Sequence, residues 1–155
     1  MVFLFALLTQ VSIAPENEPG TALILEGQVT NIDGQPIADA EVTAWHTDAK
    51  GYYGEDASGV PRLKATAVTD SSGWYHFKTI RPGGYAGENM AAHVHFEVKA
   101  TGHTKAGATI HFADDPRVSK EQAKQAKSKG FFSDILVIET NTDGIQTGRR
   151  DFRLQ

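Results

Sequence analysis

Two histidines separated by one residue are the side chains with the clearest chemical potential in this chain. They lie in the stretch Ala92–Val98, AHVHFEV, whose polar and apolar residues alternate as in a β-strand. Because alternate side chains of a strand point to one face, His93 and His95 share a face, roughly 6–7 Å apart at ~3.3 Å per residue. The pair could converge on one metal ion. The alternative is two surface histidines on the solvent side of an edge strand.

The other ligands of such an ion would have to be histidine, carboxylate or tyrosine, because the chain has no cysteine. His76 is expected to face solvent, since the aromatic residues on either side of it take the core side. His103 lies in a predicted loop, whereas His46 or His111 could line a site. The sequence shows no close carboxylate pair, no Gly-x-Ser-x-Gly motif and no phosphate-binding glycine loop.

Length and charge restrict the class of protein. A chain of 155 residues suits a single domain with its own core. The formal net charge is -4, which argues against a nucleic-acid partner. No apolar run approaches the ~20 residues that a membrane-spanning helix needs.

The N-terminal segment Met1–Ala14 is apolar from Val2 to Leu8 and contains a small-x-small triplet at Ser12-Ile13-Ala14. These features resemble a secretory signal, but no Lys or Arg precedes the apolar stretch and Pro15 would follow the cut. The segment could instead pack on the domain, or reflect a truncated or misassigned start. We leave residues 1–15 out of the expected fold and assign the domain to residues 16–155. The location of the protein, exported or cytoplasmic, stays open.

The rest of the chain consists of short β-type runs separated by turn signals such as Asn31-Ile32-Asp33-Gly34 and Asp70-Ser71-Ser72-Gly73. About eight short strands predict an all-β protein, a β-sandwich, with one short surface helix at Ser119–Lys127 that has a capping-box start. The expected strands are Ala22–Thr30, Glu41–Thr47, Lys64–Thr69, Trp74–Ile80, Ala92–Ala100, Gly107–Phe112, Asp134–Thr140 and Gln146–Leu154.

Three segments together resemble a known family. They are the stretch from Val29 through Gly34-Gln35-Pro36-Ile37 and Trp45-His46 to Gly51-Tyr52-Tyr53, then Thr69-Asp70 through Thr79-Ile80-Arg81-Pro82-Gly83-x-Tyr85, then His93-x-His95-Phe96. In this order and spacing the chain, over about Leu25 to Pro116, resembles the catalytic domain of intradiol ring-cleavage dioxygenases, such as protocatechuate 3,4-dioxygenase and catechol 1,2-dioxygenase.

The resemblance implies a non-haem iron(III) centre. Its ligands would be Tyr53, Tyr85, His93 and His95, with Tyr85 and His93 axial, and the two tyrosines would also take part in catalysis. A slip of one residue would replace Tyr53 by Tyr52. The donor set is chemically consistent, because phenolate is a hard anionic oxygen donor suited to Fe(III). The implied reaction cleaves a small aromatic diol with O₂, between its two hydroxylated carbons, to a muconate-type product. Such family members are often homo-oligomers.

The sequence departs from the family pattern around the ligands. The family usually has an Arg shortly before the first metal histidine, and Glu88–Ala92 contains none. A Gln expected on the next strand is replaced near Thr109. Arg62 or Arg81 could reach the site from elsewhere, although Arg81 belongs to the turn motif. Iron binding is therefore better supported than fast ring cleavage, since changes around the ligands can slow a reaction without removing the metal.

Two alternatives remain at the level of sequence. A non-catalytic β-sandwich module, similar to transthyretin-like or carboxypeptidase regulatory domains, would share the Gly-x-Pro-Ile and Thr-Asp-x-x-Gly turns for structural reasons. An iron oxygenase of this fold with a different reaction would account for the missing Arg. The set of two tyrosines and two histidines favours the dioxygenase over the binding module.

Overall fold

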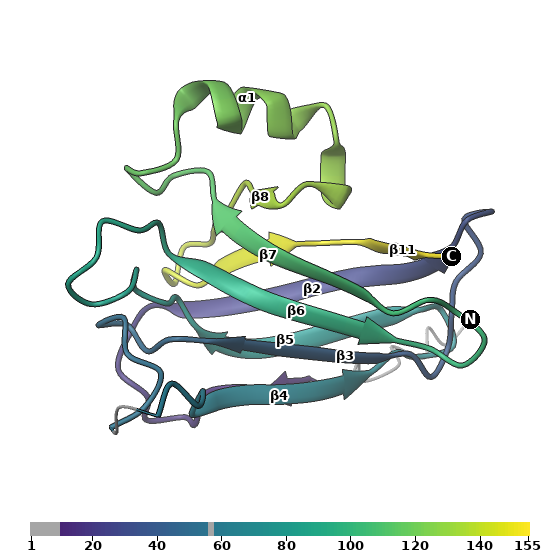
Figure 1. Cartoon of the computed structure of the whole chain (residues 1–155), viewed down its shortest axis with the longest axis horizontal. Helices are drawn as coiled ribbons and strands as arrows, with labels where there is room; N and C mark the ends of the chain where they lie inside the picture. The colour runs from purple at the N-terminus through teal and green to yellow at the C-terminus, as the bar shows by residue number, and fades with distance from the viewer. Residues whose placement is uncertain (1–9, 56–57) are drawn as a thin grey trace.

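A computed structural model describes residues 10–55 and 58–155. The protein is a β-sandwich of two sheets, from which one short helix protrudes (Figure 1). The first sheet has the order β1 (Val11–Ser12), β5 (Trp74–Ile80), β2 (Ala22–Asn31), β10 (Gln146–Arg149) and β9 (Glu139–Thr140), with β11 (Phe152–Leu154) also paired to β2. The second has the order β4 (Leu63–Val68), β3 (Glu41–His46), β6 (His93–Lys99), β7 (Ala106–Phe112) and β8 (Ile135–Leu136).

The core lies between the two sheets and follows the alternation of the strands. In β6, Val94, Phe96 and Val98 are at most 2% exposed. Opposite them lie Tyr75 and Phe77 of β5, and Tyr75 contacts Phe96 with ring centroids 6.1 Å apart. This arrangement confirms the all-β sandwich. Because side chains alternate along a strand, His93 and His95 lie on the other face of β6.

The strands are more numerous than expected, with eleven among the described residues. The predicted strand Asp134–Thr140 is two short strands, β8 and β9. The predicted strand Gln146–Leu154 is interrupted at Arg150–Asp151, where the Asp151 carboxylate accepts the Gln28 N–H at 2.9 Å in place of a backbone carbonyl. A strand at the N-terminal side was not expected, but β1 pairs with β5 in parallel.

The segment after β1 is part of the core. Ile13 and Ala14 are each 6% exposed, and the Ile13 N–H donates to the Lys78 carbonyl at 2.9 Å. Residues 1–9 lie outside the described residues, so the export signal stays a prediction.

The helix α1 (Lys120–Lys127) confirms the predicted surface helix. The Ser119 side chain accepts the Gln122 N–H and the Gln122 side chain accepts the Ser119 N–H, which is the predicted capping box. A short 3-10 turn, η1 (Gly130–Phe132), follows. Within residues 10–55 and 58–155, no helix has the length and apolar character needed to cross a bilayer.

One five-residue turn occurs four times. Its first residue is Asn or Asp, whose side-chain oxygen accepts the N–H groups of the third and fifth residues at 2.9–3.0 Å, and its fourth residue is a glycine with φ between +78° and +91°. The four turns are Asn31–Gln35, Asp48–Tyr52, Asp70–Trp74 and Asn141–Ile145. The second of these leads directly into Tyr53.

Candidate metal centre

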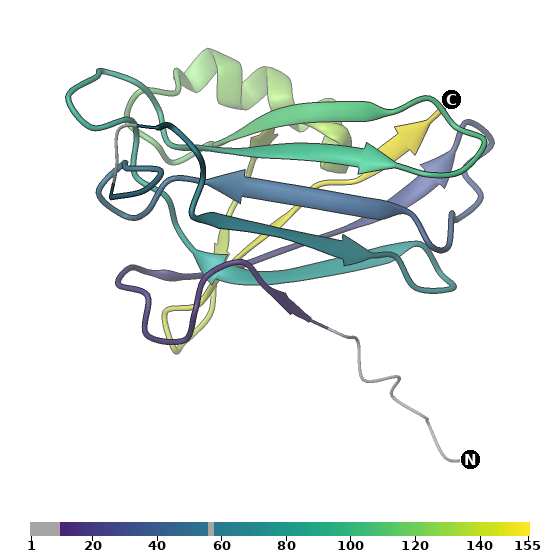
Figure 2. The same cartoon turned by 60° about the horizontal axis from the view of Figure 1, so that its bottom comes forward.

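The candidate site lies at the end of the second sheet where β3 ends and β6 begins. After β3 the chain forms a loop, described over residues 47–55 and 58–62, which carries Tyr53. It enters β6 from a loop over residues 81–92, which carries Tyr85. Both loops lie at the same end of the sandwich (Figures 1 and 2). The loops that carry Tyr53 and Tyr85 therefore meet at β6, the strand that carries His93 and His95.

The four predicted ligands are brought together. The Tyr53 Oη lies 2.7 Å from the Tyr85 Oη and 3.0 Å from the His95 Nε2. The His93 ring lies 4.8 Å from the Tyr85 ring and 4.9 Å from the His95 ring, centroid to centroid. The adjacent Tyr52 is 54% exposed, whereas Tyr53 is partly buried. The geometry thus favours Tyr53 over Tyr52 as the member of this cluster.

The preceding loop orients the His93 imidazole, and the neighbouring strands orient that of His95. The His93 Nδ1 donates to the Ala91 carbonyl at 2.9 Å, which leaves the His93 Nε2 with a free lone pair. The His95 Nδ1 lies 3.2 Å from the Thr109 Oγ1 on β7, and Trp45 of β3 stacks on the His95 ring at 5.2 Å. Both histidines can therefore present Nε2 to a metal ion while Nδ1 is occupied.

Close backbone packing positions the two tyrosine loops relative to each other. A Cβ built on Gly51 would lie 1.9 Å from the Gly84 carbonyl oxygen, and one built on Gly83 would lie 2.6 Å from the Ala49 carbonyl oxygen. The Gly83 N–H donates to the Asp48 carbonyl at 2.9 Å, and the Ala86 N–H donates to the Gly51 carbonyl at 3.2 Å. Because only glycine permits this approach, the distance between Tyr53 and Tyr85 is set by backbone contacts.

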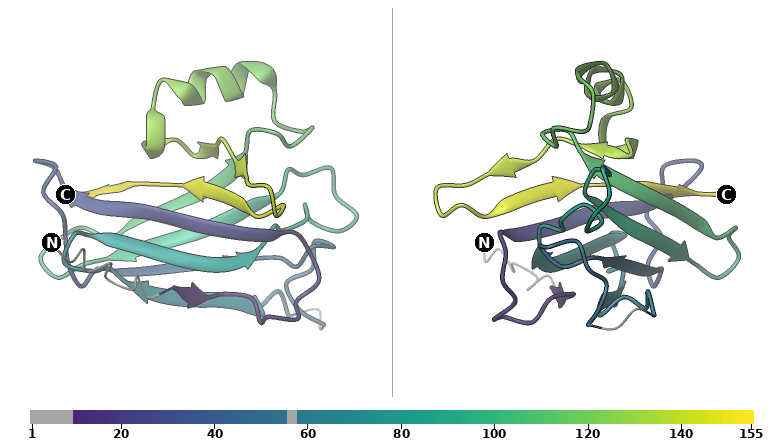
Figure 3. Two further views of the ribbon diagram at one scale, coloured as in Figure 1. Left: turned by 180° about the vertical axis from the view of Figure 1, so that it is seen from behind. Right: turned by 60° about the vertical axis from the view of Figure 1, so that its left-hand side comes forward.

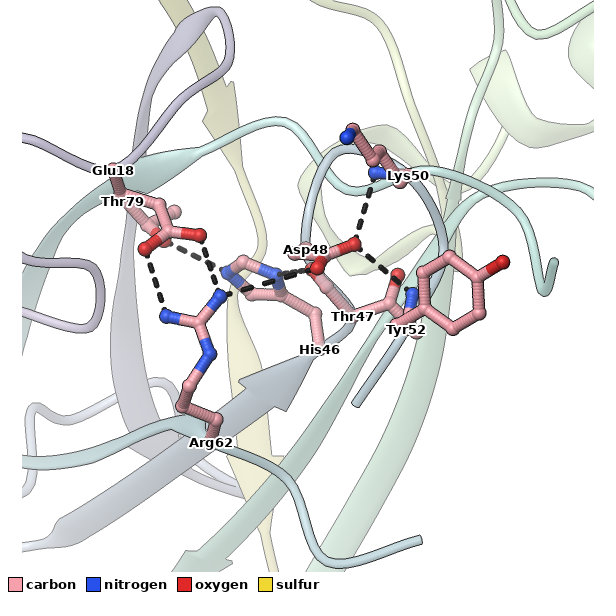
Figure 4. Close-up of polar contacts among 8 residues, drawn as sticks. All are labelled: Glu18, His46, Thr47, Asp48, Lys50, Tyr52, Arg62 and Thr79. Atoms are coloured by element: carbon pink, nitrogen blue, oxygen red, sulfur yellow. Dashed lines mark hydrogen bonds and ion pairs between the residues drawn. The ribbon is translucent and has the colours of Figure 1, made fainter. Parts of the chain in front are cut away.

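Side-chain contacts hold the base of the Tyr53 loop (Figure 4). The Asp48 carboxylate accepts the N–H groups of Lys50 and Tyr52. Arg62, the last residue of the loop, forms two hydrogen bonds with Glu18 at 2.7 and 2.8 Å. These contacts fix both ends of the loop that carries Tyr53.

Neither arginine suggested by the sequence is directed at the cluster. Arg62 is paired with Glu18, and Arg81 binds Asp114 with two hydrogen bonds while its guanidinium lies over the Phe112 ring. A third arginine, which sequence reasoning missed, approaches the segment before His93. The Arg117 Nε donates to the Asn89 Oδ1 at 3.2 Å. The only sequence signal for it is its position just after Asp115-Pro116, at the end of the region that resembles the family.

Asp115 joins the arginine segment to the first histidine. Its carboxylate accepts the Ala92 N–H at 3.0 Å and lies 3.5 Å from the Arg117 guanidinium. Burial by itself would raise the pKa of Asp115, but the hydrogen bonds from the backbone N–H groups of Arg117 and Ala92, with the Arg117 charge, bring it below its usual range. Asp115 is therefore a charged anchor for the residue that precedes His93.

The remaining histidines have other surroundings. His46 is fully buried and faces the core; its Nδ1 donates to the Thr47 carbonyl at 2.6 Å and its Nε2 accepts from the Thr79 hydroxyl at 2.8 Å (Figure 4). His76 was expected to face solvent, but its side chain is only 12% exposed, because Trp74 stacks on it and Glu26 lies 3.2 Å away. His111 lies beside His93, with ring centroids 5.6 Å apart.

The cluster is poorly solvated and favours neutral side chains. Burial, and then the hydrogen bond to Tyr85, raise the pKa of Tyr53 well above the ordinary value of a phenol. Burial and the neighbouring imidazoles of His93 and His111 lower the pKa of His95. Metal binding would need a phenolate at Tyr53, so only a strongly charged cation would displace that proton.

The donor set fits a hard trivalent ion better than a softer one. Two phenol oxygens and two imidazole nitrogens are available, and phenolates offset the charge of the ion in a partly dry site. Among the described residues, no three His, Cys, Asp or Glu side chains are grouped so that they could hold a metal ion. Metal binding at this cluster would therefore depend on the tyrosines.

Comparison with known proteins assigns the chain to a family. The model of a protein family described as "Dioxygenase" matches residues 7–155. The chain belongs to this family, that of the intradiol ring-cleavage dioxygenases.

Individual relatives support the same family. Catechol 1,2-dioxygenase of Acinetobacter baylyi is 33% identical over 117 residues, which are 63% of this chain and 38% of the relative. 6-chlorohydroxyquinol 1,2-dioxygenase of Cupriavidus pinatubonensis is 32% identical over 102 residues, or 54% of this chain and 37% of the relative. The chain thus spans well under half the length of these curated relatives.

Solved structures share the fold. The crystal structure of catechol 1,2-dioxygenase from Pseudomonas arvilla C-1 superposes with a TM-score of 0.74 at 25% identity, covering 94% of this chain and 56% of that one. The dioxygenase domain of a dioxygenase carbohydrate-binding protein fusion from Streptomyces sp. SirexAA-E superposes with a TM-score of 0.72 at 22% identity, covering 97% and 92%. At that identity the second likeness concerns the fold alone.

Proposed function

We propose that this protein is a non-haem iron(III) dioxygenase that cleaves a catechol-type ring between its two hydroxylated carbons. The observation that carries the proposal is the convergence of the four side chains. The Tyr53 Oη lies within 3.0 Å of the Tyr85 Oη and the His95 Nε2. The His93 ring packs against the rings of Tyr85 and His95. Relatives named catechol 1,2-dioxygenase and membership of the family support the reaction class. Family membership also favours an enzyme over a non-catalytic binding module.

In this proposal the four ligands are Tyr53, Tyr85, His93 and His95. A bound iron(III) ion would supply a Lewis-acid centre at which the diol and O₂ meet. The residues of the chain hold and move protons around it. Both imidazoles would hold the ion through Nε2, because the Nδ1 of His93 is bonded to the Ala91 carbonyl and that of His95 to the Thr109 hydroxyl. The resemblance assigns to the Tyr85 Oη the acceptance of one proton from the substrate.

Substrate would reach the site over the tyrosine loops. A hollow of about 280 Å³ lies against Tyr53 and Tyr85, and its walls include Gly51, Ala86 and Glu88. Small residues leave space beside the two phenols for an aromatic ring. Catechol would therefore approach from the loop side, where no strand intervenes.

The absence of an arginine in Glu88–Ala92 bears on the rate. Arg117 places a positive charge next to this stretch, because it donates a hydrogen bond to Asn89. Its side chain is 43% exposed, so solvent screens that charge. We expect ring cleavage to be slow relative to iron binding. Iron binding without cleavage of any catechol, but with another O₂-dependent reaction, would favour an iron oxygenase of this fold with a different chemistry.

The test is a visible absorption spectrum of the iron-loaded protein, recorded before and after adding catechol without oxygen. We expect a broad tyrosinate-to-iron band that shifts with catechol, followed by oxygen uptake and a muconate-type product once air is admitted. Tyr53→Phe should weaken the band and iron retention, whereas Tyr52→Phe should leave both unchanged. His95→Ala should abolish iron binding and His103→Ala should not. A colourless protein that does not retain iron would contradict the proposal.

A further inference from the structure

Positive charge is concentrated in one segment of this acidic protein. Residues 117–132, which we call the basic segment, contain five cationic side chains and one carboxylate, Glu121, while the whole chain carries a net charge of -4. The cationic residues are Arg117, Lys120, Lys124, Lys127 and Lys129. So uneven a distribution suggests that this part of the surface meets a negatively charged partner.

Three of these lysines lie on one face of α1. Lys120, Lys124 and Lys127 are spaced i, i+4, i+7, which places them in a single stripe along the helix. Glu121 is on another side, where its carboxylate accepts a hydrogen bond from Gln125. Lys124 and Lys127 lie in the last turn, where positive charge favours the helix dipole. Lys120 lies in the first turn, where positive charge is unfavourable, so helix stability does not explain the whole stripe.

The lysines have no acidic partners within the described part of the chain. None of Lys120, Lys124, Lys127 and Lys129 lies within 4.0 Å of an Asp or Glu oxygen in residues 10–55 and 58–155. Lys99 and Lys105 on the second sheet, by contrast, are both paired with Glu97. The stripe is therefore free to contact an external anionic surface.

Exposed apolar side chains lie next to the stripe. Phe131 and Phe132 of η1 are 52% and 39% exposed, and Val137 nearby is 59% exposed. The guanidinium of Arg149 lies 3.9 Å from the centre of the Phe131 ring, and that of Arg153 lies 4.8 Å from the centre of the Phe132 ring. These contacts hold the two rings at the surface beside the lysines.

Within the basic segment, the helix α1 stands apart from the two sheets. In Figures 1 and 3 the helix α1 lies beyond both sheets, and only Ala126 among its residues is buried. A flat partner could contact α1 and η1 without meeting the loops of the candidate metal centre.

We propose that the basic segment binds the surface of an anionic lipid bilayer, with the lysine stripe over the headgroups and the phenylalanine pair in the interface. Basic residues beside exposed aromatic side chains are the combination that binds such surfaces peripherally. A nucleic acid fits less well, because a phosphate backbone does not bury Phe131 or Val137. This inference does not depend on the metal centre.

The test is co-sedimentation of the full chain with vesicles of phosphatidylcholine containing 30 mol% phosphatidylglycerol, and with vesicles of phosphatidylcholine alone. We expect binding to the anionic vesicles at 50 mM salt, with a sharp decrease at 300 mM, because salt shortens the range of electrostatic attraction. The variant K120Q/K124Q/K127Q should bind roughly a hundredfold less, since each lysine near an anionic surface contributes roughly a fivefold factor. The binding that remains at 300 mM salt should come from the two phenylalanines, so F131S/F132S should show no such residual binding.

The matched control is K78Q/K99Q/K105Q, which removes the same charge from exposed lysines on the two sheets. It should bind the anionic vesicles nearly as well as the unchanged protein. Equal losses in the two triple variants would overturn the proposal, because binding would then follow net charge alone. No binding to anionic vesicles at low salt, or tighter binding to single-stranded nucleic acid, would overturn it as well. Circular dichroism of each variant checks that it is folded.

Discussion

The turn that precedes Tyr53 and the turn that joins β4 to β5 have the same local structure. In the first, the Asp48 carboxylate accepts the N–H groups of Lys50 and Tyr52 at 2.9 and 3.0 Å. In the second, Asp70 accepts those of Ser72 and Trp74 at the same distances. Each has a glycine at the fourth position with positive φ.

Their surroundings differ. The Asp70 turn continues straight into a strand, so it serves the scaffold. Its Gly73 packs against the Val29 carbonyl, which belongs to the scaffold strand β2. Gly51 of the Asp48 turn packs against the Gly84 carbonyl, in the loop that carries Tyr85. Local sequence thus determines the conformation of the turn, while the contacts made by one glycine determine whether that turn positions a functional side chain. The following predictions test this comparison.

The largest effect is expected for Gly51→Ala. The new Cβ would lie 1.9 Å from the Gly84 carbonyl oxygen, and φ is already +91°. We expect a loss of about 3 kcal/mol in the free energy of unfolding and a loss of iron retention, because the tyrosine loops must separate. Urea denaturation and iron analysis measure both. Gly144→Ala, at the same position of another turn with open space around it, should cost about 1 kcal/mol and keep iron; similar effects of both changes would refute the role of the Gly51 contact.

A smaller effect is expected for Asp48→Ala. It leaves two loop N–H groups without their acceptor, which should cost about 1–2 kcal/mol in unfolding free energy. Asp70→Ala should cost a similar amount by the same measurement. Only Asp48→Ala should also weaken the tyrosinate-to-iron band, since only its turn leads to Tyr53. If Asp70→Ala weakens the band equally, the two turns are not functionally distinct.

The third prediction concerns support of a ligand from a neighbouring strand, β7, and not from a loop. Thr109→Val removes the oxygen that contacts the His95 Nδ1, and should lower iron affinity roughly tenfold with little change in the unfolding temperature. Iron competition with a chelator measures the affinity. Thr66→Val, which removes the Thr43–Thr66 hydrogen bond on the same sheet, is the control and should leave iron affinity unchanged.

The smallest effect concerns His46 and pH. Burial lowers the pKa of His46 below its ordinary value of 6.5, so the unfolded chain binds a proton that the folded protein resists. Stability should therefore fall as pH drops below 6.5, towards the lower pKa of the folded state. His46→Gln should make the fall in unfolding temperature between pH 7.5 and 5.5 shallower but not abolish it, because His95 and His111 also have lowered pKa values. An unchanged slope would show that His46 titrates normally.

Much of the site could be predicted because it depends on local patterns. The alternation in Ala92–Val98 placed His93 and His95 on one face, and the Asp-Gly and Asp-x-x-Gly signals marked the turns. Tyr53 needed the family resemblance, because loop residues have no periodicity that assigns a direction. The structure now distinguishes it from Tyr52 by exposure.

Long-range pairings could not be predicted from sequence. Arg62 pairs with Glu18, which is 44 residues away in the sequence, and Arg81 pairs with Asp114, which is 33 residues away. Neither partner is signalled by spacing, so both arginines remained open candidates for the site. The break between β10 and β11 has the same origin, because the Asp151 side chain bonds to Gln28 across 123 residues.

The position of β2 has a consequence for how the protein reaches its folded state. This strand lies between β5 and the strands β10 and β11, which are made after the other described strands. A growing chain can form the β2–β5 pair but leaves the other edge of β2 open until residues 146–154 have been synthesised. Pairings over such long separations slow folding and expose strand edges to aggregation. We therefore expect the newly made chain to depend on residues 146–154 to cover this edge of β2 and prevent aggregation.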